Sequence, residues 1–124
     1  MEGVAYLELQ GMFSPMTDPF SKDLVAASSK PIVLSILARG ENYGYAILQE
    51  VRERSNGRLD WTEGMLYPVL HRLETQKLIR SRWVVVESGR KRKYYKLSRT
   101  GTQALATERE QWSAVNGTLK ALWG

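Results

Sequence analysis

Two strand-like runs lie next to each other late in the chain, and they constrain its fold more than any other feature. The runs read RSRWVVVES over 80–88 and KRKYYKLS over 91–98, and Ser88, Gly89 and Arg90 connect them. Both are rich in Val, Trp and Tyr, which favour strands, and a short connection that contains Gly is typical of a hairpin. The sequence therefore predicts an antiparallel hairpin over about 80–98.

The charge of the chain is concentrated in this hairpin. The stretch from Ser88 to Gly101 carries six of the 18 Lys and Arg residues and none of the 13 acids, so the other 110 residues hold 12 cations and 13 acids. A solvated loop is the ordinary interpretation of four adjacent cations. An excess focused in one segment also indicates a polyanionic partner that is contacted at one place.

Helical periodicity dominates the residues before the hairpin. A first buried helix is predicted from Lys30 to Arg39-Gly40. A short helix is predicted before it and starts at Asp18-Pro19. Pro31 is expected either to start a new helix or to kink this short helix. A second helix is predicted over about 43–54. Its apolar residues are Gly44, Ile47, Leu48 and Val51. Residues 1–17 show no sustained period and are predicted to be a disordered or loosely docked arm.

The third predicted helix begins after Thr62, a good N-cap, and ends near Lys77. One face of this helix is apolar, with Leu66, Val69, Leu70 and Leu73. The opposite face holds Glu63, Gly64, Tyr67, Pro68, His71 and Thr75, a mixture that is unusual for a face that meets only solvent. Three helices followed by a hairpin is the order of a winged helix-turn-helix, so we expect a mainly α (α+β) domain over 18–99.

A long helix is predicted after the hairpin, from a capping box at Thr100 to about Trp123. Its apolar residues occupy heptad positions a and d, with Glu108 as the one polar d residue. These apolar residues are Leu105, Trp112, Val115, Leu119 and Leu122. Gly117 lowers the stability of this helix by about 1 kcal/mol. We expect residues 100–124 to form a dimerisation helix that pairs with a second copy of the chain.

Several classes of protein are disfavoured by what the sequence lacks. There is no Cys, so disulfides and Cys-ligated metals are excluded and a reducing compartment, the cytoplasm, is the expected location. The longest apolar run, PIVLSILA over 31–38, is too short to span a membrane. His71 is the only histidine and no catalytic triad or phosphate-binding loop is evident, so we expect neither a metal, a cofactor nor catalysis.

The aromatic residues have different expected roles. Tyr94 and Tyr95 alternate across the hairpin, so at least one should pack in the core. Trp61 and Trp83 are expected in the core as well. Trp112 lies on the heptad seam, where a large ring near a twofold axis either packs in the dimer or contacts an effector.

Three blocks of this sequence resemble the PadR-like transcriptional regulators, from about Leu24 to Trp123. The blocks are NYGYAI over 42–47, GMLYPVLHRLE over 64–74 leading into LIRSRW, and GRKRKYYKLSRTG over 89–101. The single C-terminal helix resembles that of the small subfamily that includes the multidrug-responsive repressor LmrR. The resemblance implies a homodimeric repressor that binds a palindromic double-stranded DNA operator and, in many members, releases it when a small aromatic or toxic compound binds.

Some DNA-contacting residues are predicted from their own chemistry, and the other site residues are implied by the family resemblance. A capped helix with short or polar groups at its N-terminus can enter a major groove, which favours Thr62, Glu63, Gly64 and Tyr67, with His71 near DNA. The resemblance implies that the wing cations Arg90, Lys91, Arg92 and Lys93 reach phosphate or minor groove. It also implies an effector pore at the dimer interface, lined by Trp112, Leu24, Lys30, Leu105, Asn116 and Leu119.

Two residues depart from the family pattern. Lys77 stands where the third helix usually ends in Gly, so a left-handed turn there costs around 1 kcal/mol or the turn differs. Pro31 interrupts a first helix that is often continuous, which affects the expected pore wall near Lys30.

The competing hypothesis is a winged-helix adaptor that contacts only proteins, although such an adaptor has no need of six focused cations.

Overall fold

The computed structural model describes residues 20–124. The predicted arm over residues 1–17 lies outside this part of the chain. Four helices and a small sheet follow one another in the predicted order, with one strand more than expected. The elements are α1 (Lys22–Leu37), β1 (Asn42–Tyr43), α2 (Gly44–Arg54), α3 (Glu63–Thr75), β2 (Ile79–Val85), β3 (Lys91–Leu97) and α4 (Arg99–Trp123).

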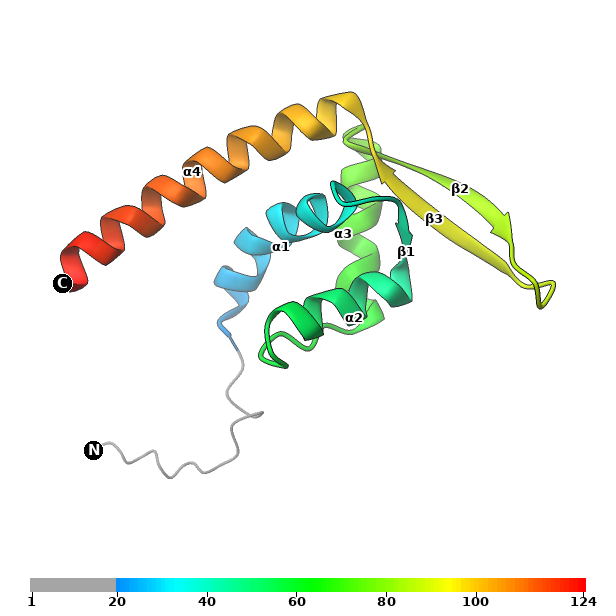
Figure 1. The fold of residues 1–124 in the computed structure, drawn as a ribbon, viewed down its shortest axis with the longest axis horizontal. Coiled ribbons are helices and arrows are strands. Elements are labelled where there is room, and N and C mark those ends of the chain that lie inside the picture. Colours follow the sequence, from blue (N-terminus) through cyan, green and yellow to red (C-terminus); the bar gives the residue numbers. More distant parts are fainter. Residues whose placement is uncertain (1–19) are drawn as a thin grey trace, which may run out of the picture.

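The helices α1, α2 and α3 surround one core, the β2–β3 hairpin projects from one side, and α4 extends past α1 on the other side (Figure 1). This is a mainly α winged helix with a β wing, as the sequence predicts. Among the described helices none is long and apolar enough to cross a membrane.

The first helix excludes one of the two outcomes expected at Pro31, the start of a new helix. The helix α1 runs from Lys22 to Leu37 without a new start at Pro31, and the Oγ of its N-cap Ser21 accepts a hydrogen bond from the Leu24 amide at 3.1 Å. The helix start expected at Asp18-Pro19 lies outside the described residues. Proline removes one amide donor, but side chains on both sides of it are buried: Ser29 before it, and Val33 and Leu34 after it. Tertiary packing therefore outweighs the local preference of proline.

The third helix ends as a Schellman motif, with lysine at the position that favours glycine. Lys77 has φ 64°, the Leu78 amide donates to the Leu73 carbonyl at 2.9 Å, and the Lys77 amide donates to the Glu74 carbonyl at 2.9 Å. The carbonyl of Lys77 in turn accepts hydrogen bonds from the Ser98 and Thr100 hydroxyls, both at 2.7 Å. These bonds hold the left-handed conformation, so the first of the two expected outcomes at Lys77 is confirmed.

The sheet contains the predicted hairpin and a third strand that was not expected from the sequence. Its order is β1-β3-β2, and both pairs are antiparallel. The two residues of β1 pair with the wing in the register Asn42 to Tyr95 and Tyr43 to Tyr94. The short strand therefore ties the base of the wing to the start of α2.

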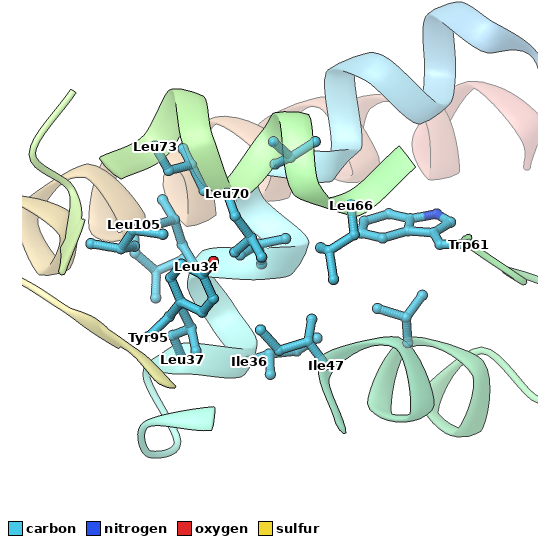
Figure 2. Close-up of a cluster of buried hydrophobic side chains, with 14 residues drawn as sticks. Leu34, Ile36, Leu37, Ile47, Trp61, Leu66, Leu70, Leu73, Tyr95 and Leu105 are labelled. Atoms are coloured by element: carbon cyan, nitrogen blue, oxygen red, sulfur yellow. The ribbon is translucent and has the colours of Figure 1, made fainter. Parts of the chain in front are cut away.

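The core confirms most of the predicted apolar faces (Figure 2). Tyr95 and Trp61 are buried, at 4% and 6% exposure, as expected. Trp83 was expected in the core, and this is wrong: it is 64% exposed on the wing. The strand alternation places Trp83 on the same face as Tyr95, but it lies two residue pairs farther along the hairpin, where the helices no longer cover the sheet.

The last helix starts earlier than the predicted capping box at Thr100. Ser98 is the N-cap, and its Oγ accepts a hydrogen bond from the Gly101 amide at 3.0 Å. A reciprocal capping box also needs a side chain three residues after the cap, and Gly101 has none. Gly101 and Leu105 are buried against the domain, whereas Val115 and Leu122 are exposed.

Candidate nucleic-acid interface

Helix α3 presents two chemically different faces. Leu66, Val69, Leu70 and Leu73 are at most 8% exposed and anchor the helix in the core. The other face, with Glu63, Gly64, Tyr67 and His71, is exposed. The predicted surface helix is thus held from behind by the core while its polar face remains accessible.

The N-terminus of α3 is capped and open. Thr62 Oγ1 accepts a hydrogen bond from the Met65 amide at 3.3 Å, as predicted. A Cβ added at Gly64 would meet only Thr62 Oγ1, at 3.7 Å, which is ordinary van der Waals contact. Packing within the described chain therefore does not require glycine at position 64.

Tyr67 links the exposed helix to the helix that precedes it. Its ring is 43% exposed, yet a Cβ added at Gly44, the first residue of α2, would overlap with the Tyr67 hydroxyl. Gly44 therefore allows Tyr67 to lie against the start of α2. This contact joins α2 and α3, the two helices of the helix-turn-helix.

The start of α2 adds surface residues that the sequence did not indicate as part of the site. Tyr43 is the N-cap but provides no side-chain hydrogen bond to the first-turn amides. Tyr45, next to Gly44, is 57% exposed, and its hydroxyl accepts a hydrogen bond from Gln49 Nε2 at 3.4 Å. Uncapped amides at a helix N-terminus are donors that suit an anion such as phosphate. The signal was present in the block NYGYAI, which carries two tyrosines around the glycine.

The four wing cations fall into two groups. Arg90 and Lys91 at the tip are exposed, whereas Arg92 and Lys93 are half-buried. The Arg92 guanidinium carbon lies 4.4 Å from the centre of the Tyr43 ring. Lys93 Nζ lies 5.9 Å from the centre of the Trp83 ring. Such cation–π contacts position the inner charges, and the outer pair extends into solvent.

No ion pair joins any of these four cations to a carboxylate in the described part of the chain. The salt bridges nearby involve other residues: Arg82 Nη2 and Glu41 Oε1 are 2.6 Å apart. The hydrogen bond from Arg82 lowers the pKa of Glu41, and the same bond raises the pKa of Arg82. The wing charge is thus left available for an external anion.

The buried Tyr95 lies where the base of the wing meets the core. Burial raises the pKa of its hydroxyl, with smaller contributions from Tyr67 and Glu74. Glu74 also accepts a short hydrogen bond from the Ser81 hydroxyl, which joins α3 to β2. The wing and α3 are therefore connected through buried and half-buried groups.

The residues expected around an effector are only partly brought together within one chain. Lys30 and Trp112 meet through Glu108: Lys30 Nζ lies 3.6 Å from Glu108 Oε2, and the Trp112 indole donates to Glu108 Oε1 at 3.2 Å. Leu105 packs in the core, while Leu24 and Asn116 are exposed and Leu119 is half-buried. Trp112 also borders a groove of about 520 Å³ between α1 and α2. No group of three or more His, Asp or Glu side chains in the described chain could hold a metal.

Comparison with known proteins agrees with this geometry. The model of the transcriptional regulator PadR-like family matches residues 33–107, which is more than half of the chain. The chain belongs to the PadR-like family. PadR-family transcriptional regulators bind DNA and commonly act as dimers, and they are generally not enzymes.

Individual known proteins are similar to this one over most of the chain. An uncharacterized protein X of Lysinibacillus sphaericus is 32% identical over 75% of this chain and 85% of its own length. The transcriptional regulator YqjI of Escherichia coli is 32% identical over 73% of this chain, which spans only 42% of YqjI. The crystal structure of a PadR family transcription regulator from Clostridium difficile has a TM-score of 0.70 and 30% identity, and covers 78% of this chain and 99% of its own.

Proposed function

We propose that this PadR-family chain is a homodimeric repressor that binds a palindromic operator and is modulated by a small aromatic compound. The observation that carries the proposal is the combined surface of α3, the start of α2 and the wing. It offers an exposed polar helix face for base edges, and wing cations that pair with no carboxylate among residues 20–124 for phosphates. In this division Tyr67 and its neighbours select the sequence, and Arg90 and Lys91 supply affinity without selectivity.

Dimerisation is proposed from the apolar residues of α4. Val115, Leu122 and Trp123 are 53%, 75% and 77% exposed in the single chain, and the end of the helix extends beyond the domain (Figure 1). A second copy of the helix would remove this apolar surface from water. Two wings held at a fixed separation would then match the two halves of a palindrome.

Trp112 is the proposed contact for the effector. Its ring is half-buried, and the bond to Glu108 connects it to Lys30 on α1. A ligand that moves Trp112, Glu108 and Lys30 would change the packing of α4 against α1, and this would change the separation of the two wings. The competing adaptor hypothesis leaves the wing cations without a role.

Operator selection by Tyr67 is tested with two DNA duplexes, the region upstream of the gene and a shuffled version of equal composition. Tyr67→Ala should weaken binding to the upstream duplex about tenfold more than binding to the shuffled one, because base contacts carry about 1–3 kcal/mol each. Fluorescence anisotropy at fixed salt measures both affinities. Equal losses on both duplexes would contradict the role of Tyr67, and no preference in the unchanged protein would favour the adaptor.

The effector contact is tested by adding flat aromatic compounds to the purified protein and following tryptophan emission. In Trp112→Phe the quenching should largely disappear, and the aromatic compounds should bind about tenfold more weakly, because the stacking surface is smaller. Trp123→Phe at the exposed end of the same helix is the control. An unchanged affinity in Trp112→Phe would refute the site.

A further inference from the structure

One face of the wing carries exposed apolar side chains. The alternation of the hairpin places Trp83 and Val85 of β2 and Lys91 and Lys93 of β3 on the same side, which we call the Trp83 face. Trp83 and Val85 are 64% and 65% exposed. A single exposed apolar residue needs no explanation, but these two occupy alternate positions of the edge strand β2 and form an apolar row. The Trp83 face therefore presents apolar surface that a partner would remove from water.

A cation stands beside each apolar side chain of this face. The register pairs Trp83 with Lys93 and Val85 with Lys91. Lys93 Nζ lies 5.9 Å from the centre of the Trp83 ring and 5.8 Å from the centre of the Tyr95 ring. Neither lysine pairs with a carboxylate among residues 20–124. The Trp83 face thus combines an apolar row on β2 with a parallel cationic row on β3.

The opposite face of the wing is partly occupied by the chain itself. Arg82 on that face is bound to Glu41, with Nη2 and Oε1 2.6 Å apart. The Arg92 guanidinium stacks on the ring of Tyr43, and the Tyr43 ring centre lies 5.3 Å from that of Tyr94. The two faces of the hairpin therefore differ, and the Trp83 face is the one whose charges are left for an external partner.

The base of the Trp83 side of the hairpin is joined to α3. The Ser81 hydroxyl donates a hydrogen bond to Glu74 of that helix, and Tyr67 of α3 contributes to the raised pKa of the Tyr95 hydroxyl. The hairpin leaves the helices near the end of α3 and projects beyond them (Figure 1). A duplex that contacts the exposed side of α3 would therefore lie next to the Trp83 face.

The two rows match the chemistry of a nucleic-acid backbone, in which apolar deoxyriboses alternate with anionic phosphates. Side chains two positions apart on a strand are spaced by about 6.7 Å. This spacing is close to that of neighbouring phosphates on one DNA strand, so Lys91 and Lys93 suit two successive phosphates. An acidic protein segment would also match the charge, but the position beside α3 favours DNA.

We propose that the Trp83 face packs against one sugar–phosphate strand of duplex DNA, with Trp83 and Val85 on the deoxyriboses and Lys91 and Lys93 on the phosphates. This inference rests on the proposed DNA-binding function and adds an apolar contact to it. The contact depends on neither the base sequence nor the release of counterions, because Trp83 and Val85 carry no charge and face the backbone.

The test is Trp83→Thr combined with Val85→Thr, which keeps residues that favour strands. This variant should bind the upstream and the shuffled duplex about tenfold more weakly, because apolar contact area is lost. The slope of log affinity against log salt should stay the same, because no cation is removed. Val84→Thr is the matched control: it lies on the same strand but on the opposite face, and both affinities should be unchanged.

A second measurement uses the unaltered protein. The indole N–H resonance of Trp83, identified by its absence in Trp83→Phe, should shift when the shuffled duplex is added to saturation. The resonance of the buried Trp61 should not move.

Three results would overturn the inference while leaving selection by Tyr67 intact. These are an unchanged DNA affinity in the double variant, an equal loss in Val84→Thr, or a Trp83 resonance that does not move. Unchanged DNA affinity would leave an acidic protein segment as the partner of this face. A loss confined to the upstream duplex would make Trp83 a base contact and would also contradict the proposal. If the original protein bound neither duplex, the proposed function would fail and this inference with it.

Discussion

Gly101 is the residue at which the fold tolerates least change. An added Cβ would overlap with the Leu78 carbonyl oxygen and crowd the Leu97 side chain, and the backbone atom cannot move aside. Gly101→Ala should lower the free energy of unfolding by about 3 kcal/mol, as overpacking does. Gly117→Ala in the same helix is the matched control, since an added Cβ there meets nothing within 4 Å, and it should raise stability by about 1 kcal/mol.

Urea denaturation at one protein concentration measures both glycine variants. A Gly101→Ala protein as stable as the original would show that α4 does not pack on the Leu78 carbonyl as described. Sequence alone could not single out Gly101, because its neighbour Leu78 is 23 positions away and belongs to another part of the fold. The N-cap at Thr62 could be predicted from the sequence, because its partner is only three residues away, and this prediction is confirmed.

At the scale of elements, the sequence predicted what depends on local pattern. The faces of α2 and α3 and the β2–β3 hairpin follow from periodicity and turn residues, and they are confirmed. The two-residue strand β1 was missed, since it exists only through its pairing with Tyr94 and Tyr95. The new helix expected as one outcome at Pro31 is wrong for a similar reason, because burial of residues on both sides outweighs the preference of proline.

The candidate site shows the same division. The exposed residues of α3 and of the wing tip were predicted, since alternation and capping place them on the surface. The contact of Tyr67 with Gly44 and the stacking of Arg92 on Tyr43 were not, because each joins elements that meet only in the folded chain. Trp83 is exposed for the same reason: its surroundings depend on how far the helices reach along the wing.

The exposed seam of α4 carries the prediction at this scale. Val115→Glu combined with Leu122→Glu should convert the dimer to a monomer, because paired helices would bury like charges in an apolar seam. Sedimentation equilibrium measures the mass directly. Ser113→Glu, exposed at an outer heptad position, should leave the dimer intact. A double variant that stays dimeric would assign the interface to another surface.

The charge distribution determines behaviour at the scale of the whole molecule. The net charge of +5 arises from the wing and its return strand, while the rest of the chain is nearly neutral. Association with DNA should therefore depend on a few phosphates per protomer and not on a diffuse positive field. A dimer doubles these phosphate contacts and fixes their separation.

The most direct test of this account is the salt dependence of affinity for the upstream DNA, compared between the original protein and Arg90→Gln combined with Lys91→Gln. Both residues are exposed and free of the ring contacts that hold Arg92 and Lys93, so folding should be unaffected. The plot of log affinity against log salt should flatten by about one for each phosphate that the variant no longer neutralises. An equal slope and affinity in the two proteins would contradict the claim that the wing binds the DNA backbone.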